Sequence, residues 1–254
     1  MKLGAQLYSL RENCDTPEKL KETLNRVKKM GYDIVQASAI CDIDPALLKS
    51  YIEEFDIPIG CTHRPFNEIV NETEKCISFH KTIGCSVIGL GSMPVEYRGS
   101  YEELLKFRDL ISPAIKKIKE AGLTFAYHNH AFDFDAIGNT SIMEFLINDM
   151  NDVDFILDVY WVKYAGKSIE EYMRRLTELG KLNHIHFKDM KEEPQGSICA
   201  CGDGVIDFDY LSKLCRELGI ENVYVEQDNA PSFPDAFEEI KKSYIHLNKI
   251  VKEN

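Results

Sequence analysis

Four short segments of the sequence contain residues of the types that bind metal ions or transfer protons in proteins. The segment FAYHNHAFDF (125–134) contains His128, His130 and Asp133, although the whole chain has only 7 histidines. The other segments are ILDVYW, HIHFKD and VEQD, which contain Asp158; His184, His186 and Lys188; and Glu226 and Asp228. Imidazoles and carboxylates together suit a borderline or hard divalent ion such as Mn²⁺, Zn²⁺, Co²⁺ or Mg²⁺. A metal site is therefore the first hypothesis, provided that the fold brings these segments together.

The elements that would position these residues alternate regularly along the chain. Eight β-rich segments cover 3–9, 33–38, 58–63, 86–91, 123–130, 154–160, 182–187 and 222–227. Each precedes a segment with apolar residues at helical spacing, over 17–30, 45–55, 67–84, 101–122, 141–150, 168–180, 208–219 and 234–251. Eight such units predict an α/β protein built as a single (β/α)₈ TIM barrel over residues 1–254. A doubly wound open sheet is the alternative.

The composition of the chain argues against several classes of protein. The chain has 254 residues, 44% of them hydrophobic, and a formal net charge of −12. This acidic balance lacks the basic footprint of a nucleic-acid binder, so we expect no nucleic-acid partner. The N-terminal MKLGAQLYSLREN contains no long apolar stretch, which predicts neither secretion nor a membrane partner. The 8 cysteines include no C-x-x-C pair, which favours reduced thiols and a cytoplasmic location.

A barrel places reactive groups at the C-terminal ends of its strands, and the polar residues of this chain concentrate there. Alternate residues of a strand share a face, so His128 pairs with His130, and His184 with His186. One imidazole or carboxylate from each of four consecutive strands would form a mixed nitrogen and oxygen site with room for a substrate. The further polar strand ends carry Gln6 and Tyr8, Gln36, and His63.

Each of these residues also has a structural interpretation. A lone strand histidine is more often a hydrogen-bonded core residue than a ligand, Asp158 could cap a loop, and Glu226 could pair with Lys188. Four such residues at the correct ends of adjacent strands nevertheless favour a site for the set as a whole.

The chain resembles the sugar phosphate isomerase/epimerase family of xylose-isomerase-like TIM barrels. The resemblance rests on LGAQLYSLREN, YHNHAFDF, LDVYWVKYAG, HIHFKDM, GDGVIDF and VYVEQD, and extends over nearly the full length. In that family a divalent metal is held by Glu, Asp, His and Glu on strands five to eight. The resemblance implies that Asp158, His186 and Glu226 are the ligands of strands six to eight.

The strand-five position departs from the family pattern. Many relatives have ENH where this chain has HNH, so His128 takes the place of a Glu. We expect His128 to be the fourth ligand, with His130 as the less favoured choice. Asp133 lies slightly downstream, where a Glu is common in the family, and is expected to reach the substrate or to support the site from behind.

The resemblance also implies the chemistry, which is proton abstraction beside a carbonyl. Glu226 is the expected base, and Lys188, His63 and Asp133 are the candidate acids. The expected substrate-binding residues are Gln6, Tyr8, Gln36, His63, His130, Trp161 and Lys188. Few cationic side chains lie near these positions, so an unphosphorylated keto-sugar or polyol is favoured over a sugar phosphate.

Three functions follow from these expectations. The first is a metal-dependent isomerase or epimerase that acts on a keto-sugar through an enediolate. The second is a metal-dependent lyase or dehydratase of the inosose or 3-keto-glycoside type, which the missing strand-five Glu favours slightly. The third is a non-catalytic sugar-binding module. A small-molecule sugar is the expected partner in all three, and a homo-oligomer is compatible with each.

Overall fold

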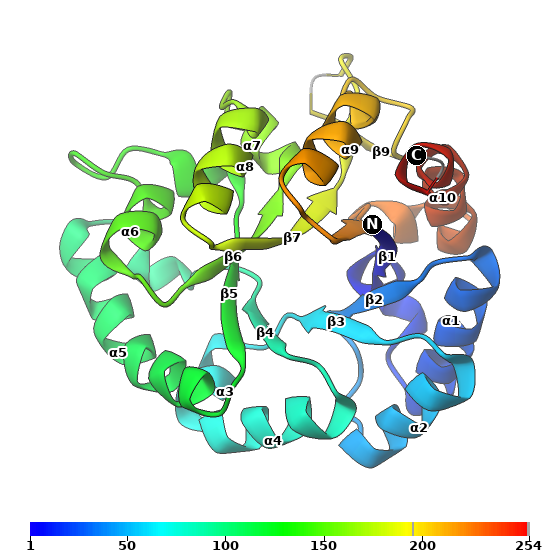
Figure 1. The fold of residues 1–254 in the computed structure, drawn as a ribbon, viewed down its shortest axis with the longest axis horizontal. Coiled ribbons are helices and arrows are strands. Elements are labelled where there is room, and N and C mark those ends of the chain that lie inside the picture. The colour runs from blue at the N-terminus through cyan, green and yellow to red at the C-terminus, as the bar shows by residue number, and fades with distance from the viewer. Residues whose placement is uncertain (195, 253–254) are drawn as a thin grey trace.

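Eight parallel strands form the centre of the molecule in the computed structural model, which describes residues 1–194 and 196–252 (Figure 1). The strands are β1 (Lys2–Gln6), β2 (Ile34–Ala37), β3 (Ile59–Thr62), β4 (Val87–Leu90), β5 (Thr124–His128), β6 (Asp154–Asp158), β7 (Leu182–Phe187) and β10 (Asn222–Val225). Their order is β3-β2-β1-β10-β7-β6-β5-β4. At the seam the backbone N–H of Arg64, just after β3, donates to the carbonyl of Gly89 on β4. The predicted α/β barrel is confirmed, and the open sheet is excluded.

Helices surround the strands (Figure 1). They are α1 (Pro17–Met30), α2 (Pro45–Phe55), α3 (Phe66–Asn71), α4 (Thr73–Ile83), α5 (Tyr101–Glu120), α6 (Ile142–Asp149), α7 (Val159–Tyr164), α8 (Ile169–Glu178), α9 (Phe208–Glu217) and α10 (Ala236–Lys252). Short 3-10 segments are η1 (Leu7–Asn13), η2 (Val95–Tyr97), η3 (Ala131–Phe134) and η4 (Ala230–Ser232). A small antiparallel pair, β8 (Asp189–Met190) and β9 (Ile198–Cys199), follows β7.

The sequence pattern located most helices closely, and α1 shows why. Thr16 accepts a hydrogen bond from the N–H of Lys19, and Pro17 occupies the first turn, where its missing N–H costs nothing. Leu20, Leu24 and Val27 form the buried stripe. The helix ends at Gly31, whose φ of 105° lies in the left-handed region.

Two parts of the helix prediction need correction. The single helix expected over 67–84 is two helices, because the chain leaves helical geometry at Glu72, where φ is −124° and ψ is 36°. The helix α7 was not expected, and the sixth strand was expected to continue through its first two residues, Val159 and Tyr160. That strand stops at Asp158, whose side chain caps α7.

The interior of the barrel is filled by a small cluster, distinct from the larger one between strands and helices. Its members are Ile34, Cys61, Val87, Ala126, Ile156 and Tyr224. Tyr224 is fully buried and lies over Gly4 and Gly60. A Cβ at Gly4 would come 2.5 Å from Cδ1 of Tyr224, so this strand position requires glycine. The packed cluster closes the barrel beneath the strand ends.

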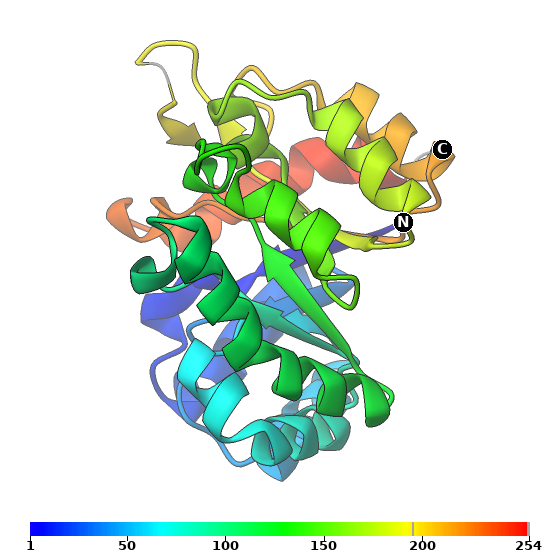
Figure 2. The same ribbon diagram turned by 90° about the vertical axis from the view of Figure 1, so that its left-hand side faces the viewer.

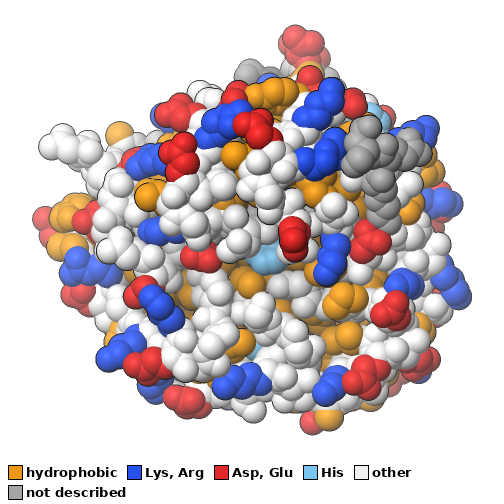
Figure 3. All heavy atoms as spheres, viewed as in Figure 1, with side chains coloured by type: hydrophobic (Ala, Val, Ile, Leu, Met, Phe, Trp, Pro, Cys, Tyr) orange, Lys and Arg blue, Asp and Glu red, His pale blue; other side chains and the backbone are white. Residues whose placement is uncertain are grey.

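The two ends of the barrel differ. Both chain termini lie at one end, while η4 and the segment that carries β9 lie at the other (Figure 2). On the face shown in Figure 3, acidic and basic side chains are interspersed around the rim. Among the described residues, no helix combines the length and apolarity needed to cross a bilayer. All 8 cysteines are free.

We predict that Gly4→Ala destabilises the protein, because the added methyl group would collide with Tyr224 and with Ile34. Overpacking of this kind costs about 1–3 kcal/mol in the free energy of unfolding, measurable by urea titration. Lys116→Ala on the exposed surface of α5 is the control, with an expected change within about 0.5 kcal/mol. Equal stability of the two variants would show that the barrel interior has spare room.

Candidate active site

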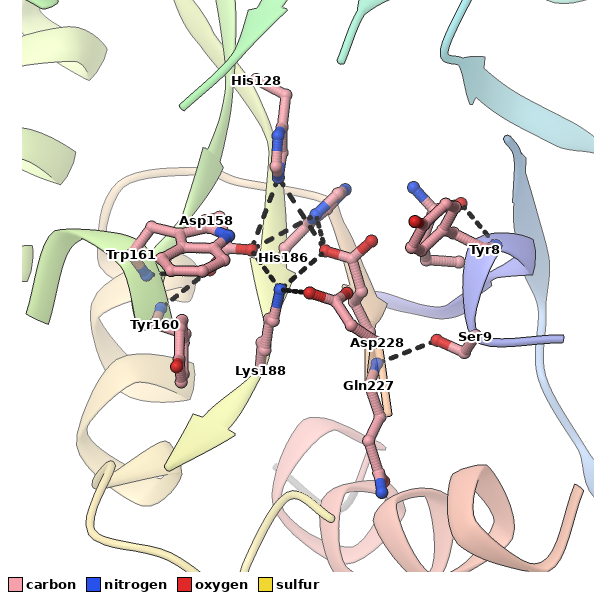
Figure 4. A network of polar contacts seen from close by, with 12 residues as sticks. Tyr8, Ser9, His128, Asp158, Tyr160, Trp161, His186, Lys188, Gln227 and Asp228 are labelled. Carbon is pink, nitrogen blue, oxygen red and sulfur yellow. Dashed lines mark hydrogen bonds and ion pairs between the residues drawn. The ribbon is translucent and has the colours of Figure 1, made fainter. Parts of the chain in front are cut away.

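Four side chains from four adjacent strands meet at the C-terminal end of the barrel. His128 ends β5, Asp158 ends β6, His186 lies on β7, and Glu226 follows β10. One ligand atom from each lies within 4.8 Å of the others. All four side chains are buried, and Figure 4 shows His128, Asp158 and His186 pointing toward one another. These four residues are the metal ligands expected from the sequence.

Two of the donor atoms at the centre have no hydrogen-bond partner within the protein. Nε2 of His128 lies 3.4 Å from Oδ2 of Asp158, and Nδ1 of His186 lies 3.8 Å from the same oxygen. Nε2 of His128 and Oδ2 of Asp158 are buried and have no hydrogen-bond partner. Because unpaired buried polar atoms are costly, such a pair of orphaned atoms calls for a ligand. Two imidazoles and two carboxylates suit a divalent ion, so the residues present fit the metal that the sequence analysis expected.

Neighbouring groups hold each donor in its orientation. Nε2 of His186 lies 2.6 Å from Oε1 of Gln36, which leaves Nδ1 directed at the centre, 3.0 Å from Oε2 of Glu226. Nδ1 of His128 lies 3.1 Å from the carbonyl oxygen of Gly91, which leaves Nε2 at the centre. Oδ1 of Asp158 accepts from the N–H groups of Tyr160 and Trp161, so only Oδ2 is free to face inward. Asp158 can therefore cap α7 with Oδ1 and bind a metal ion with Oδ2.

Lys188 places an ammonium group beside the two buried carboxylates. Its Nζ lies 3.8 Å from Oδ2 of Asp158, 3.7 Å from Oε2 of Glu226 and 2.7 Å from Oδ2 of Asp228. Its ammonium also lies over the aromatic faces of Tyr160 and Trp161. Figure 4 shows Lys188 directed at the same centre as the histidines. The side chain is 1% exposed, so this charge acts in a poorly solvated place.

The electrostatics of the cluster are mutually dependent. Burial disfavours the charged form of Glu226, yet Lys188 and His186 hold the pKa of Glu226 well below its usual range. Burial likewise opposes a proton on His186, but Glu226 and Asp158 raise the pKa of His186 to about 9. Without a bound cation, the protonated His186 ring and the Lys188 ammonium therefore balance the negative charge of the carboxylates at the centre. A metal ion would replace the His186 proton, since ligation needs the neutral ring.

A cavity of about 1170 Å³ opens at this centre. Of the residues expected to bind substrate, Tyr8, His63, His130 and Lys188 line it, together with the ligand candidates His128 and Glu226. Burial lowers the pKa of His130 to about 3 and that of His63 well below its usual range, so both rings are neutral. Nε2 of His63 is buried without a hydrogen-bond partner, which leaves it available to a ligand.

Three residues expected at the substrate lie outside the lining of this cavity. Gln6 is fully buried, and its Oε1 accepts a hydrogen bond from the backbone N–H of Tyr8, two residues farther along the chain. Gln36 lies behind the ring of His186. Trp161 packs against His130 and under Lys188, with its indole N–H buried and unpaired. These contacts indicate that Gln6 and Gln36 support the site from behind. Trp161 differs, because its indole N–H remains available to a ligand next to the site.

Asp133 is fully buried and both of its oxygens are already engaged. Oδ1 accepts from the hydroxyl of Tyr127, and Oδ2 accepts from the backbone N–H of His130. Burial raises the pKa of Asp133 to about 7, against the effect of both hydrogen bonds. Asp133 was expected either to reach the substrate or to support the site, and this geometry favours the supporting role, because Asp133 fixes the backbone at His130.

Asp228 was not among the expected site residues, yet its side chain lines the cavity and accepts a hydrogen bond from Lys188. The alternation that paired His184 with His186 also places Asp228 on the same face as Glu226, so the sequence contained this indication. His184 lies deeper in the barrel, with Nδ1 3.4 Å from the hydroxyl of Tyr224. Asp189 accepts hydrogen bonds from the backbone N–H groups of Met190, Gly202, Gly204 and Ile206. It therefore holds the loop after β7.

Comparison with known proteins shows the family to which the chain belongs. An inosose dehydratase from Erwinia tasmaniensis is 23% identical over 93% of this chain and 93% of its own length. The crystal structure of a sugar phosphate isomerase/epimerase from Parabacteroides distasonis superposes with a TM-score of 0.81, at 24% identity, over 99% of this chain and 96% of that one. The IOLI protein, crystallised with a zinc atom, has a TM-score of 0.75 at 19% identity over 100% and 99% of the two chains. The sequence profile of one family matches residues 24–249, and the chain belongs to that family, the xylose isomerase-like TIM barrels.

Proposed function

We propose that this protein is a divalent-metal-dependent enzyme that removes a proton next to the carbonyl of a keto-sugar or related polyol. The observation that carries the proposal is the convergence of His128, Asp158, His186 and Glu226 on one buried centre at the cavity. A divalent ion held there would polarise the substrate carbonyl and stabilise the negative charge of the enediolate. Zinc is one candidate, since the similar IOLI structure contains it. A purely sugar-binding module would not need this donor set.

The side chains around the centre divide the remaining work. Glu226 lines the cavity as a carboxylate and takes the α-proton. Lys188 donates hydrogen bonds to substrate oxygens, with its ammonium held in place by Asp228. Neutral His63 and His130 line the cavity and bind hydroxyl groups. Tyr8, held under the guanidinium of Arg11, presents an aromatic face to the sugar.

Two outcomes of the same proton abstraction remain, and a specific observation favours each. Return of a proton to a different face or carbon gives an isomerase or epimerase, the activity named for the Parabacteroides distasonis structure. Loss of a β-hydroxyl gives a dehydratase, as in the inosose dehydratase relative. Glu226 and Asp228 extend from the end of one strand, so both carboxylates approach the substrate from the same side. Epimerisation with two bases needs groups on opposite sides, and this arrangement supports dehydration as the second candidate. The free cysteines support a reducing, cytoplasmic location for either reaction.

We predict that His186→Ala removes metal binding, because it deletes a central donor and leaves the carboxylates with Lys188 alone. The metal content after dialysis against Zn²⁺ or Mn²⁺ would fall from near one ion per chain to near zero, measured by elemental analysis. The matched control is His246→Ala on the exposed surface of α10, which should keep the metal. Circular dichroism would verify that both variants fold. Full metal content in His186→Ala would contradict the site.

We predict that Glu226→Gln retains most of the metal but loses proton exchange, because the amide keeps one oxygen donor and loses its basicity. Deuterium incorporation into inosose and ketohexoses in D₂O would fall about 10²–10⁴-fold, measured by NMR. Exchange at the wild-type rate would reject Glu226 as the base. With the wild type, exchange without elimination supports an isomerase or epimerase, whereas loss of water supports a dehydratase.

We predict that Gln36→Met weakens metal binding without altering any metal ligand. The substitution removes the oxygen that accepts from Nε2 of His186, so the ring no longer keeps Nδ1 directed at the centre. Losses of this kind are about 10–100-fold in metal affinity, measurable by calorimetric titration. Gln36→Glu keeps the acceptor oxygen and should retain the affinity. A Gln36→Met protein with unchanged metal affinity and lower stability would show that Gln36 has only a packing role.

A further inference from the structure

The cavity is much larger than the centre alone requires. Its volume of about 1170 Å³ exceeds the roughly 300–1,000 Å³ that are typical of pockets for drug-sized ligands. A single sugar ring is smaller than such ligands and would leave much of the space unfilled. The additional space lies away from the metal centre, between the loop after β2, the loop after β3 and the exposed side of α4. We call this part the distal arm; it is lined by residues 39–45, 64–66, Glu68, Lys75, Ser78 and Phe79.

The distal arm offers apolar and aromatic surface. Ile40, Ile43, Pro65, Phe66 and Phe79 line it. Ile40, Phe66 and Phe79 are only partly buried, so part of their apolar surface faces the cavity. Covering this surface with an apolar group would remove it from water, which is the main favourable contribution to binding. The metal end of the cavity differs, because histidines, Lys188 and carboxylates line it.

The charged groups of the distal arm are largely satisfied within the protein. Nε and Nη2 of Arg64 donate to Oε1 of Glu68. Lys75 pairs with Glu72 at 2.9 Å. Asp44 caps α2 by accepting from the N–H groups of Ala46 and Leu47. With both cations neutralised by partners, the arm is poorly suited to a phosphate and well suited to an uncharged group.

The wall of the arm is built before any ligand arrives. The backbone N–H of Cys41 donates to the carbonyl of Cys14, which ties the loop after β2 to the end of η1. Ala39, at the start of that loop, has a φ of 53°, a left-handed conformation that a non-glycine residue rarely adopts. On the other side, the guanidinium of Arg64 lies 4.9 Å from the ring centre of Phe79. A preformed wall lowers the ordering cost of binding.

We propose that the distal arm is a second subsite, which binds an uncharged apolar or aromatic group linked to the sugar held at the metal centre. The inference rests on the proposed function, because it deepens the substrate class from a free keto-sugar to a glycoside-like conjugate. The sugar ring occupies the polar end beside Glu226 and Lys188, and its linked group lies against Ile40 and Phe66.

The test uses probes without a ketone, so that binding is measured apart from the reaction. Zn²⁺-loaded protein is titrated calorimetrically with phenyl and methyl D-glucopyranosides, each as the α and β anomer. The expected result is that one phenyl anomer binds at least tenfold more tightly than its methyl counterpart. Equal affinities, or no binding of any of the four, would overturn the second subsite whether or not deuterium exchange is seen with keto-sugars.

A pair of matched variants locates the effect. Ile40→Asp places a charge in the arm and should reduce the phenyl affinity about tenfold, toward that of the methyl glycoside. Leu47→Asp is the control, because Leu47 is exposed on α2 and does not line the cavity. Ile40→Ala, a milder change with the same expected direction, replaces Ile40→Asp if that variant fails to fold. An unchanged preference for the phenyl glycoside in the Ile40 variant would also overturn the proposal. So would a preference for glucose 6-phosphate over glucose that depends on Arg64.

Discussion

Charge balance at the C-terminal end of the barrel is the constraint on which the remaining features depend. Asp158 and Glu226 are buried carboxylates, and an uncompensated buried charge costs several kcal/mol. In the protein alone, Lys188 and a protonated His186 supply two positive charges against these two carboxylates and Asp228. With a divalent ion, the two positive charges of the metal and the one of Lys188 balance Asp158, Glu226 and Asp228. The same cluster therefore explains both why the ligand-free fold tolerates these groups and why it is suited to a cation.

Contacts behind the four donor side chains fix the orientation of each one. Each donor has one atom at the centre and another fixed elsewhere: His186 on Gln36, His128 on the carbonyl of Gly91, and Asp158 on the first turn of α7. Asp133 and Asp189 act one step farther out, through the backbone near His130 and the loop after β7. Below them, Tyr224 and its apolar neighbours fill the barrel. A rigid base and oriented donors reduce the reorganisation that binding requires.

The fold could be predicted in most of its elements because strand and helix periods are local properties of the sequence. The strands and the helices α1 and α2 were placed close to their observed bounds, with caps such as Thr16 and Gly31 marking helix ends. The first strand is the exception, because it was expected to reach residue 9 but ends at Gln6, where η1 follows. The errors arose where a single residue changed the local geometry. Glu72 divides one expected helix into α3 and α4, and Asp158 ends a strand by capping α7.

The sequence by itself determined the alternation of elements, the barrel class and the kinds of donor available on strands five to eight. Only the tertiary structure decided which member of each histidine pair faces the centre, that Gln36 supports a ligand while Asp228 reaches the cavity, and that the cavity extends into a distal arm. The physical reason is that these features depend on contacts between residues far apart in the chain, such as the 150 positions between Gln36 and His186. Strand alternation assigns a side chain to a face, but the depth of each strand in the barrel and the partners across it determine what that side chain touches.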